Sequence, residues 1–171
     1  TNSTAGNLTV GALTARTGNA SGTSASAPGG TVTITQHNAA AGAFLQTGAI
    51  STVGGSNGDG GTVTLSSHSG VQFATAATIQ TTGGTALVGT AGRAGGDLTI
   101  TGRTVTTTGA LTTSGSNGNG ADQPGGQAGA LSITSAGTVT TSAGALTASG
   151  GNAGPGTAAG GQAGALTVTN T

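Results

Sequence analysis

The chain contains 171 residues, of which 37 are glycine, and two phenylalanines are its only aromatic side chains. Three arginines balance three aspartates, so the formal net charge is zero, and cysteine is absent. These features exclude a basic surface for nucleic acid, a disulfide framework and a core built on aromatic residues. No apolar run reaches the roughly 20 residues that a membrane-spanning helix needs, so we expect no membrane span.

A seven-residue segment recurs along the chain, and residues 95–101 (GGDLTIT) are its clearest copy. Leu98 and Ile100 alternate with Thr99 and Thr101, which is the period of a strand with one buried and one solvated face. This regular alternation argues against a disordered Gly-rich chain. The first large apolar residues of the copies are Leu8, Val32, Val63, Leu98, Leu131 and Leu166. Their spacing of 24 to 35 residues predicts stacked repeats, each beginning with this first strand.

Two further apolar segments follow the first strand in each repeat. The third strand is expected at Leu13, Ile50, Ile79, Leu111 and Leu146. A shorter second strand is expected between them, at Val71, Val105 and Val139, with Phe44 and Leu45 in that role one repeat earlier. Because Val10 runs almost directly into the third strand, the first coil has no room for its second strand, and we expect this coil to be two-sided or incomplete. We expect the aliphatic residues of the first and third strands, through Leu166 and Val168 at the end, to form the interior.

A Gly-rich excursion follows each third strand. From the third-strand residue to the next first-strand residue, four of the five excursions measure 19 or 20 residues, and the second measures 13. Flexible linkers have no reason to agree in length, so we interpret the excursions as ordered lobes that stack along one edge. Asn19, Asn117 and Asn152 each lie six residues after a third-strand residue, where stacked amides are expected to form a ladder.

Together these patterns predict an all-β fold, a parallel β-helix of about five three-sided coils with stacked Gly-rich lobes on one edge. Residues 1–171 are expected to form a single β-solenoid segment of a longer repetitive chain.

With its lobe set aside, a coil such as residues 97–115 resembles the repeat of filamentous-haemagglutinin-type β-helices, found in two-partner-secretion exoproteins and large bacterial surface adhesins. The Gly-Asn-Gly-rich inserts between Thr-Val-Thr-Ile and Gly-Ala-Leu-Thr segments are similar to internal repeats of such proteins. The resemblance implies a secreted, right-handed parallel β-helix that serves as a shaft or adhesive fibre outside the cell or on the bacterial surface. The Asn-Pro-Asn type motifs of the family's secretion domain are absent, so the resemblance places this piece in the shaft.

The acidic residues do not suggest catalysis. Polysaccharide lyases and hydrolases with β-helical folds need clustered carboxylates near Arg or Lys. Asp59 and Asp122 fall in lobes, and Asp97 is expected to face outward from a first strand. We therefore expect no catalytic residues, no cofactor and no enzyme activity. Residues 54–61 have the Gly/Asp character of calcium-binding repeats, but one Asp in one coil supplies too few oxygen ligands, and a solvated turn is expected.

Two histidines are expected to lie in one column at a corner. His37 and His68 each lie five residues after a first-strand residue, and Arg103 holds the same place in the next repeat. Two imidazoles stacked about 4.8 Å apart offer a shared metal site as one interpretation. Two histidines without a carboxylate are too few ligands for a metal site, so the second interpretation, a solvated column at the corner, is favoured. We therefore expect no metal.

The outward residues of the first strands predict two ranks of hydroxyl groups. The ranks are Thr33, Thr64, Thr99, Ser132 and Thr167, and beside them Thr35, Ser66, Thr101, Thr134 and Thr169. Stacking would space them about 4.8 Å apart along the axis. Such an array resembles the Thr-x-Thr face of β-helical antifreeze proteins and forms a possible interaction face. The alternative is that Thr is simply the polar residue best suited to solvated strands.

The expected function is a non-catalytic shaft or adhesion module of a bacterial extracellular fibre. No capping helix or charged cap is evident at either end of the sequence, so we expect further coils of the same fibre, or other copies, as end-to-end partners. The alternatives are a self-polymerising filament subunit and an ice-binding solenoid. An adhesin would also contact a cell surface or extracellular matrix, whereas nucleic acid is not an expected partner.

Overall fold

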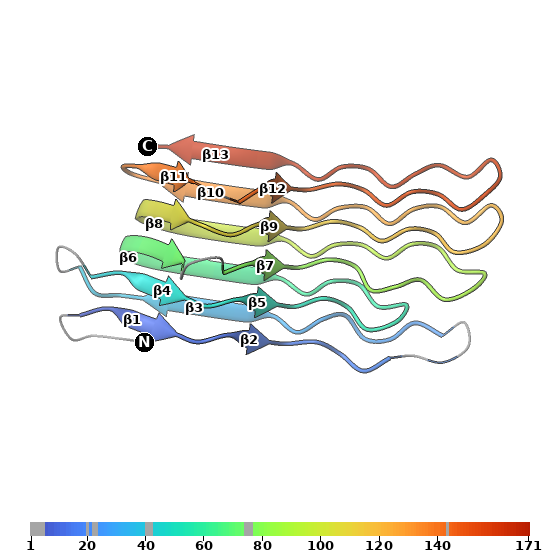
Figure 1. Cartoon of the computed structure of the whole chain (residues 1–171), viewed down its shortest axis with the longest axis horizontal. Coiled ribbons are helices and arrows are strands. Elements are labelled where there is room, and N and C mark those ends of the chain that lie inside the picture. The colour runs from blue at the N-terminus through green and yellow to red at the C-terminus, as the bar shows by residue number, and fades with distance from the viewer. Residues whose placement is uncertain (1–5, 20, 22–23, 40–42, 74–76, 143) are drawn as a thin grey trace.

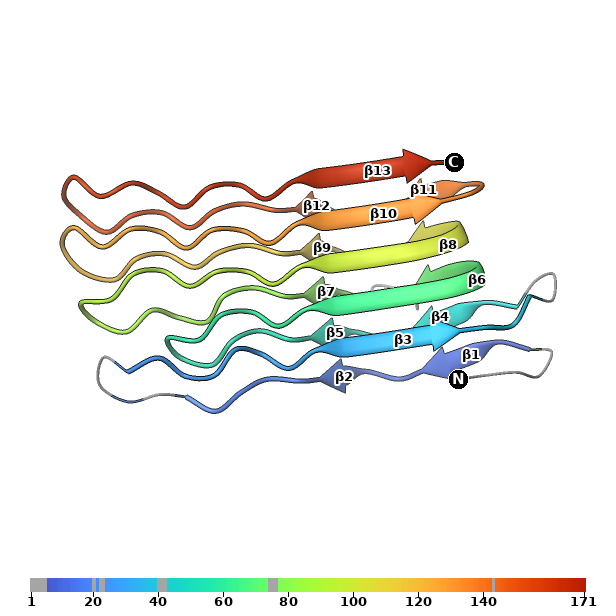
Figure 2. The same ribbon diagram turned by 180° about the vertical axis from the view of Figure 1, so that it is seen from behind.

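A computed structural model describes residues 6–19, 21, 24–39, 43–73, 77–142 and 144–171. These residues form parallel strands and no helix, wound into a β-solenoid of four complete turns with a partial turn at each end. Figures 1 and 2 show the first strands on one face, the second and third strands following one another along the opposite face, and a right-handed path between them. The predicted all-β parallel solenoid is confirmed, with about four turns rather than five.

The first strands form one continuous stack. They are β3 (Val32–Gln36), β6 (Val63–Phe73), β8 (Leu98–Thr107), β10 (Leu131–Ser135) and β13 (Leu166–Asn170). Neighbours pair in parallel and in register, so Leu98 lies between Val63 and Leu131. In-register pairing follows from the alternation, because a slip by one residue would turn every aliphatic side chain to solvent.

The other two strand positions are shorter. The second strands are β1 (Leu8–Val10), β4 (Leu45–Thr47), β11 (Val139–Thr141) and the second halves of β6 and β8, which run through both positions. The third strands are β2 (Leu13–Thr14), β5 (Ile50–Ser51), β7 (Ile79–Gln80), β9 (Leu111–Thr112) and β12 (Leu146–Thr147). They form a separate sheet in the order β12-β9-β7-β5-β2.

The first coil differs from the prediction. Leu8 pairs with Leu45 of β4, so β1 occupies the second-strand position and not the first. The physical reason is chain length: Leu13 lies five positions after Leu8, as Ile50 lies five positions after Leu45, so the segment matches the second-to-third-strand span of the adjacent coil. The prediction that this coil lacks its second strand was therefore wrong.

The core consists of aliphatic side chains that stack along the solenoid axis. Its buried members are Leu45, Ile50, Val63, Leu65, Val71, Ala77, Ile79, Leu98, Ile100, Val105, Leu111, Leu131 and Ile133. Leu13, Val32, Ile34 and Leu146 pack against it and are partly buried. The prediction for Leu166 and Val168 was wrong, since each is 50% exposed. Both lie on β13, which pairs only with β10 within the described residues, so one of its flanks has no neighbouring coil.

The lobes are ordered and stack as predicted, but they are not β-strands. Each consists of an outgoing and a returning extended run that bonds to the equivalent runs of adjacent coils (Figures 1 and 2). On one returning run the N–H groups of Asp122, Gly125 and Ala128 donate to carbonyl oxygens of the next coil. An interval of three residues is the period of polyproline II, whereas a strand repeats every two.

Glycine fills the lobes because backbone packs directly on backbone. A Cβ atom at Gly126 would overlap the backbone of Arg93, and one at Gly161 would overlap the backbone of Gly126. The same clash would occur between Gly151 and Ser116. As at the axis of collagen, only glycine fits such close approach. The glycines of the lobes are therefore required for close packing of backbone against backbone.

A threonine closes the neck of each of three lobes. The hydroxyls of Thr52, Thr81 and Thr113 donate to the carbonyl oxygens of Gly61, Gly96 and Gly129 at 2.7, 2.5 and 2.8 Å. All three threonines are completely buried. In the outermost lobes Ala15 and Ala148 hold the corresponding place. There the neck keeps a backbone hydrogen bond, in which the N–H of Gly30 or Gly164 donates to the carbonyl oxygen of the alanine.

Candidate interaction face

The outward face of the first-strand sheet carries the hydroxyl ranks that the sequence predicts. Thr33, Thr64, Thr99, Ser132 and Thr167 are paired in succession, as are Thr35, Ser66, Thr101, Thr134 and Thr169. All ten are exposed or partly exposed. Adjacent rows lie about 4.8 Å apart because this is the separation of hydrogen-bonded strands. The structure thus brings these residues together in a grid of five rows.

One margin of this grid lies beside the lobes. The hydroxyl of Thr62 donates to that of Thr31 at 3.2 Å. In the next coil Asp97 holds the same column, and its Oδ1 accepts a hydrogen bond from the backbone N–H of Ala130 at 2.8 Å. Asp97 is therefore tied to the following coil.

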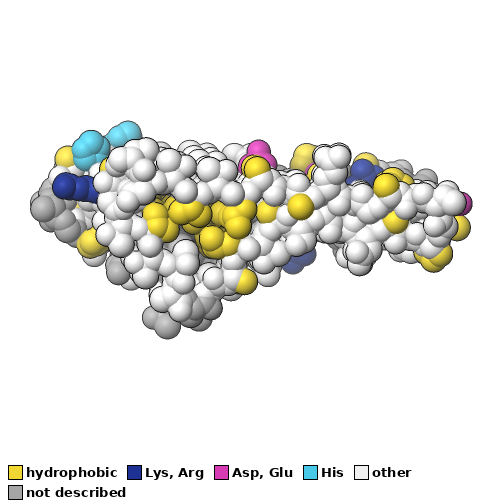
Figure 3. Space-filling model, turned by 90° about the horizontal axis from the view of Figure 1, so that it is seen from above, with side chains coloured by type: hydrophobic (Ala, Val, Ile, Leu, Met, Phe, Trp, Pro, Cys, Tyr) yellow, Lys and Arg dark blue, Asp and Glu magenta, His cyan; other side chains and the backbone are white. Residues whose placement is uncertain are grey.

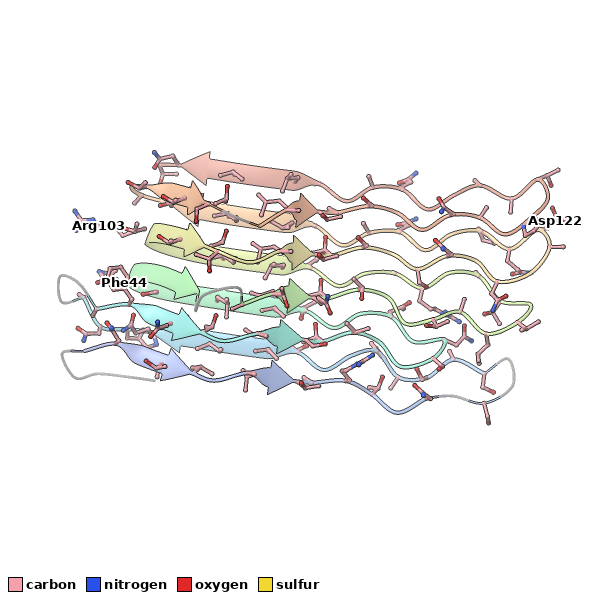
Figure 4. The ribbon with its side chains drawn as sticks, viewed as in Figure 1. Phe44, Arg103 and Asp122 are labelled. Carbon is pink, nitrogen blue, oxygen red and sulfur yellow. The ribbon has the colours of Figure 1, made fainter. Side chains whose placement is uncertain are left out.

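The other margin carries the predicted column of His37, His68 and Arg103, at the corner between the first and second strands. Gln36 pairs with Ser67 and Ser67 with Gly102, so the residues that follow them, His37, His68 and Arg103, lie on three successive coils. All three side chains are exposed. Figure 3 shows the two imidazoles side by side, and Figure 4 shows Arg103 projecting from this corner.

A groove of about 430 Å³ lies between this column and the second hydroxyl rank. Thr35, Ser66, Thr101 and Thr134 line one side, and His37, His68, Arg103 and Ala136 line the other. Because both sets run from coil to coil, the groove follows the solenoid axis. The sequence predicts the histidine column and the hydroxyl ranks but not the groove, because no pattern of residue types indicates how the backbone bends at a corner.

The three carboxylates all serve as links between coils. Besides the Asp97 bond, Asp59 Oδ1 accepts from the N–H of Ala94 at 3.0 Å. Asp122 Oδ1 accepts from the N–H and the hydroxyl of Thr157 at 2.7 and 3.0 Å. The backbone hydrogen bond from Thr157, followed by the bond from its hydroxyl, lowers the pKa of Asp122 below its ordinary value of 3.8. Within the described part of the chain, no group of three or more His, Cys, Asp or Glu side chains is placed to hold a metal ion.

The predicted asparagines link coils in the same way. Asn117 Oδ1 accepts from the backbone N–H of Asn152 at 2.8 Å, and Asn19 Oδ1 accepts from the N–H of Ser56 at 3.0 Å. These bonds join side chain to backbone, whereas the predicted ladder joins amide to amide. Asn7 does the same with the N–H of Phe44 at 2.9 Å. The sequence offers little signal for this motif, because the backbone donor carries no distinctive side chain.

A buried network fills the short second lobe. Asn57 is fully buried and has a φ of 60°. Its Oδ1 accepts hydrogen bonds from the Thr90 hydroxyl at 2.9 Å and from Arg93 Nε at 2.8 Å, and its Nδ2 donates to the carbonyl oxygen of Ser24 at 3.1 Å. Arg93 thus has a structural role, whereas the Arg103 side chain lines the groove.

Comparisons with known proteins identify no relative. No protein-family model, curated protein or solved structure matches the chain. The described residues contain no helix long and apolar enough to cross a membrane. The resemblance to filamentous-haemagglutinin-type repeats therefore rests on the repeat pattern together with the observed β-solenoid.

Proposed function

We propose that the chain is a shaft segment of a bacterial extracellular fibre or surface adhesin, with no catalytic role of its own. The observation that carries this proposal is the continuity of coil-to-coil bonding. Neighbouring strands pair in register except for a shift between β6 and β8 at Ser67–Gly70, and the lobes repeat the same stacking outside the sheets. A repeat of this kind extends by adding coils, since each coil contacts its neighbours alone.

The lobes suit a mechanical role because they widen each coil. The repeat that begins at Leu98 has 33 residues, 98–130, of which the stretch after Leu111 supplies 19. Its backbone groups bond along the axis, so axial hydrogen bonds are spread over strands and lobes alike. Bending the fibre would strain both sets, and a broad section should therefore be stiff.

The size and location of the native protein test the proposal. Antibodies raised against residues 1–171 should label the outside of intact cells. Under denaturing electrophoresis, material of several hundred kilodaltons supports one giant chain. Label confined to the cell interior would refute an extracellular fibre.

Two alternatives have a specific observation in their favour. A self-polymerising subunit is favoured by the parallel stacking of successive coils, because coils of one copy can stack on those of another in the same way. A denatured band near 15.4 kDa would support it.

An ice-binding solenoid is favoured by the regular hydroxyl ranks on a flat sheet face. Ice crystals shaped by micromolar protein, with the effect abolished by Thr99→Tyr, would support it. Unmodified crystal growth would exclude it.

A further inference from the structure

We propose that the corner groove binds a linear acidic polysaccharide whose sugars carry carboxylate groups, aligned with the solenoid axis. The proposal deepens the adhesin function by naming the class of its ligand. Charge is unevenly distributed along this chain, although the formal net charge is zero. Arg103 and both histidines line this one groove, and none of its lining residues has an acidic side chain.

The aspartates are engaged elsewhere. Asp59, Asp97 and Asp122 each accept a backbone hydrogen bond from the following coil. Figure 4 places Asp122 at the tip of a lobe and Arg103 at the opposite end of the coil. Among the described residues that line the groove, Arg103 is thus a fixed positive charge with no acidic side chain beside it, which favours an anionic ligand.

The column fits an extended ligand. His37, His68 and Arg103 directly follow the paired residues Gln36, Ser67 and Gly102 on three successive coils, and hydrogen-bonded strands lie about 4.8 Å apart. A polymer lying in the groove would meet one of these nitrogen-bearing side chains on each of three successive coils, and Ala136 on the fourth. The guanidinium of Arg103 can hold a carboxylate through two parallel hydrogen bonds.

The opposite wall favours a sugar. Thr35, Ser66, Thr101 and Thr134 present hydroxyl groups that both donate and accept hydrogen bonds, which matches the hydroxyls of a polysaccharide. An extended acidic peptide would instead be expected to pair its backbone groups with an open sheet edge. Here the groove lies on a sheet face whose backbone groups are already paired.

The small number of charged side chains in the groove further restricts the class of polymer that can bind there. Arg103 is the only side chain in the groove with a permanent positive charge. Nucleic acid and densely sulfated polymers gain affinity from many cationic contacts. A uronate polymer, with one carboxylate per sugar and many hydroxyls, fits a wall of one arginine, two histidines and a rank of hydroxyls.

The test is binding of fluorescent polygalacturonate to the full chain at low ionic strength, followed by anisotropy. We expect saturable binding that Arg103→Gln weakens about tenfold, the range of a lost charge-assisted hydrogen bond. His37→Gln/His68→Gln/Arg103→Gln should remove it. Arg16→Gln is the matched control, because it deletes the same charge from an exposed site outside the groove and should leave affinity unchanged. Circular dichroism would verify that each variant is folded.

Other polymers separate the remaining ligand classes. Neutral dextran should not bind. Equal affinity for polyglutamate would overturn the assignment to a polysaccharide, and tighter binding of chondroitin sulfate would overturn the assignment to carboxylates. Absence of polygalacturonate binding, or equal binding by the triple variant, would overturn the site itself. None of these outcomes bears on the size or location of the native protein, so failure of the groove and failure of the shaft proposal are distinguishable.

Discussion

The hydroxyl of Thr113 donates a hydrogen bond to the carbonyl oxygen of Gly129 at 2.8 Å, and the N–H of Gly129 donates to the carbonyl oxygen of Thr113 at the same distance. These two residues are 16 positions apart and stand at the two sides of a lobe's neck. Because both are buried, water cannot replace the bonds. The pair therefore joins the β-solenoid to its polyproline II-like lobe.

Removing the hydroxyl should loosen this neck. Thr113→Val keeps the shape of the side chain but leaves the carbonyl oxygen of Gly129 without its hydroxyl donor, at a cost of about 1–3 kcal/mol in unfolding free energy. Thr113→Ser retains the donor and should lose less. The urea midpoint measures the difference, and hydrogen exchange of the Gly129 amide should quicken in the valine variant. Equal midpoints for valine and wild type would contradict the role of this hydroxyl.

The effect of a glycine substitution on stability should depend strongly on its position in the lobe. At Gly126 an added Cβ would overlap backbone atoms of Arg93, which cannot move aside as a flexible side chain can. Gly126→Ala should therefore destabilise the chain by at least about 1–3 kcal/mol, as overpacking does. Gly160→Ala is the control, since its Cβ would meet Gly151 O at 3.4 Å, an ordinary contact. It should be neutral or stabilising by about 0.4–1 kcal/mol. Similar thermal midpoints for the two variants would refute backbone packing as the reason for glycine.

The strands were predictable because their signal is local. Alternation along Leu98, Thr99 and Ile100 fixes which side chains face inward, and spacing fixes the repeat. The hydroxyl ranks follow from the same alternation once pairing is in register. Leu8 shows where local prediction fails. The residues around it match the pattern of a first strand, but Leu8 pairs with Leu45 of a second strand, and this pairing cannot be predicted from the local pattern.

The lobes and the links between coils were harder to predict for a physical reason. Their hydrogen bonds run between backbone groups, or from an Asp or Asn oxygen to a backbone N–H about 35 residues away, as from Asn152 to Asn117. Every residue except proline offers that donor, so sequence cannot identify it. The neck threonines did carry a signal: Thr52, Thr81 and Thr113 each lie two residues after a third-strand aliphatic residue.

Acidification should weaken the contact at the lobe tip. Hydrogen bonds from Thr157 lower the pKa of Asp122 below its ordinary value of 3.8. A carboxylate whose pKa is lower in the folded state contributes stability above the unfolded value and loses it as pH falls through the folded value. The protection factor of the Thr157 amide, which is corrected for the intrinsic exchange rate at each pH, should therefore fall below about pH 4.

Two comparisons isolate the carboxylate of Asp122. Asp122→Asn keeps an oxygen acceptor but does not titrate, so its Thr157 amide should show no acid-dependent change in protection. The amide of Asn152, which bonds to Asn117 in the same geometry, provides the second reference within the same molecule. Equal acid sensitivity of both amides in the wild type would mean that the whole lobe opens, and would contradict a local effect of Asp122.

The cost of losing an aliphatic side chain should depend on its coil. Leu98 and Leu166 occupy the same column, separated only by Leu131, yet Leu98 is fully buried and Leu166 is 50% exposed. Leu98→Ala leaves a cavity between two coils and should cost about 2–5 kcal/mol. Leu166→Ala removes a side chain that keeps half of its contact with water, so it should cost no more than about half as much.

Urea unfolding followed by circular dichroism measures both variants, and the slope of the transition serves as an internal control. A solenoid gains stability from interfaces between neighbouring coils, so loss of Leu98 weakens two interfaces, whereas loss of Leu166 weakens one. We therefore expect Leu98→Ala to split or broaden the transition, as the coils on either side uncouple, while Leu166→Ala shifts it slightly at unchanged slope. Equal losses for the two variants would mean that the flank of β13 is covered in solution. That result would favour end-to-end association, and dilution of the Leu166→Ala protein should then restore the difference.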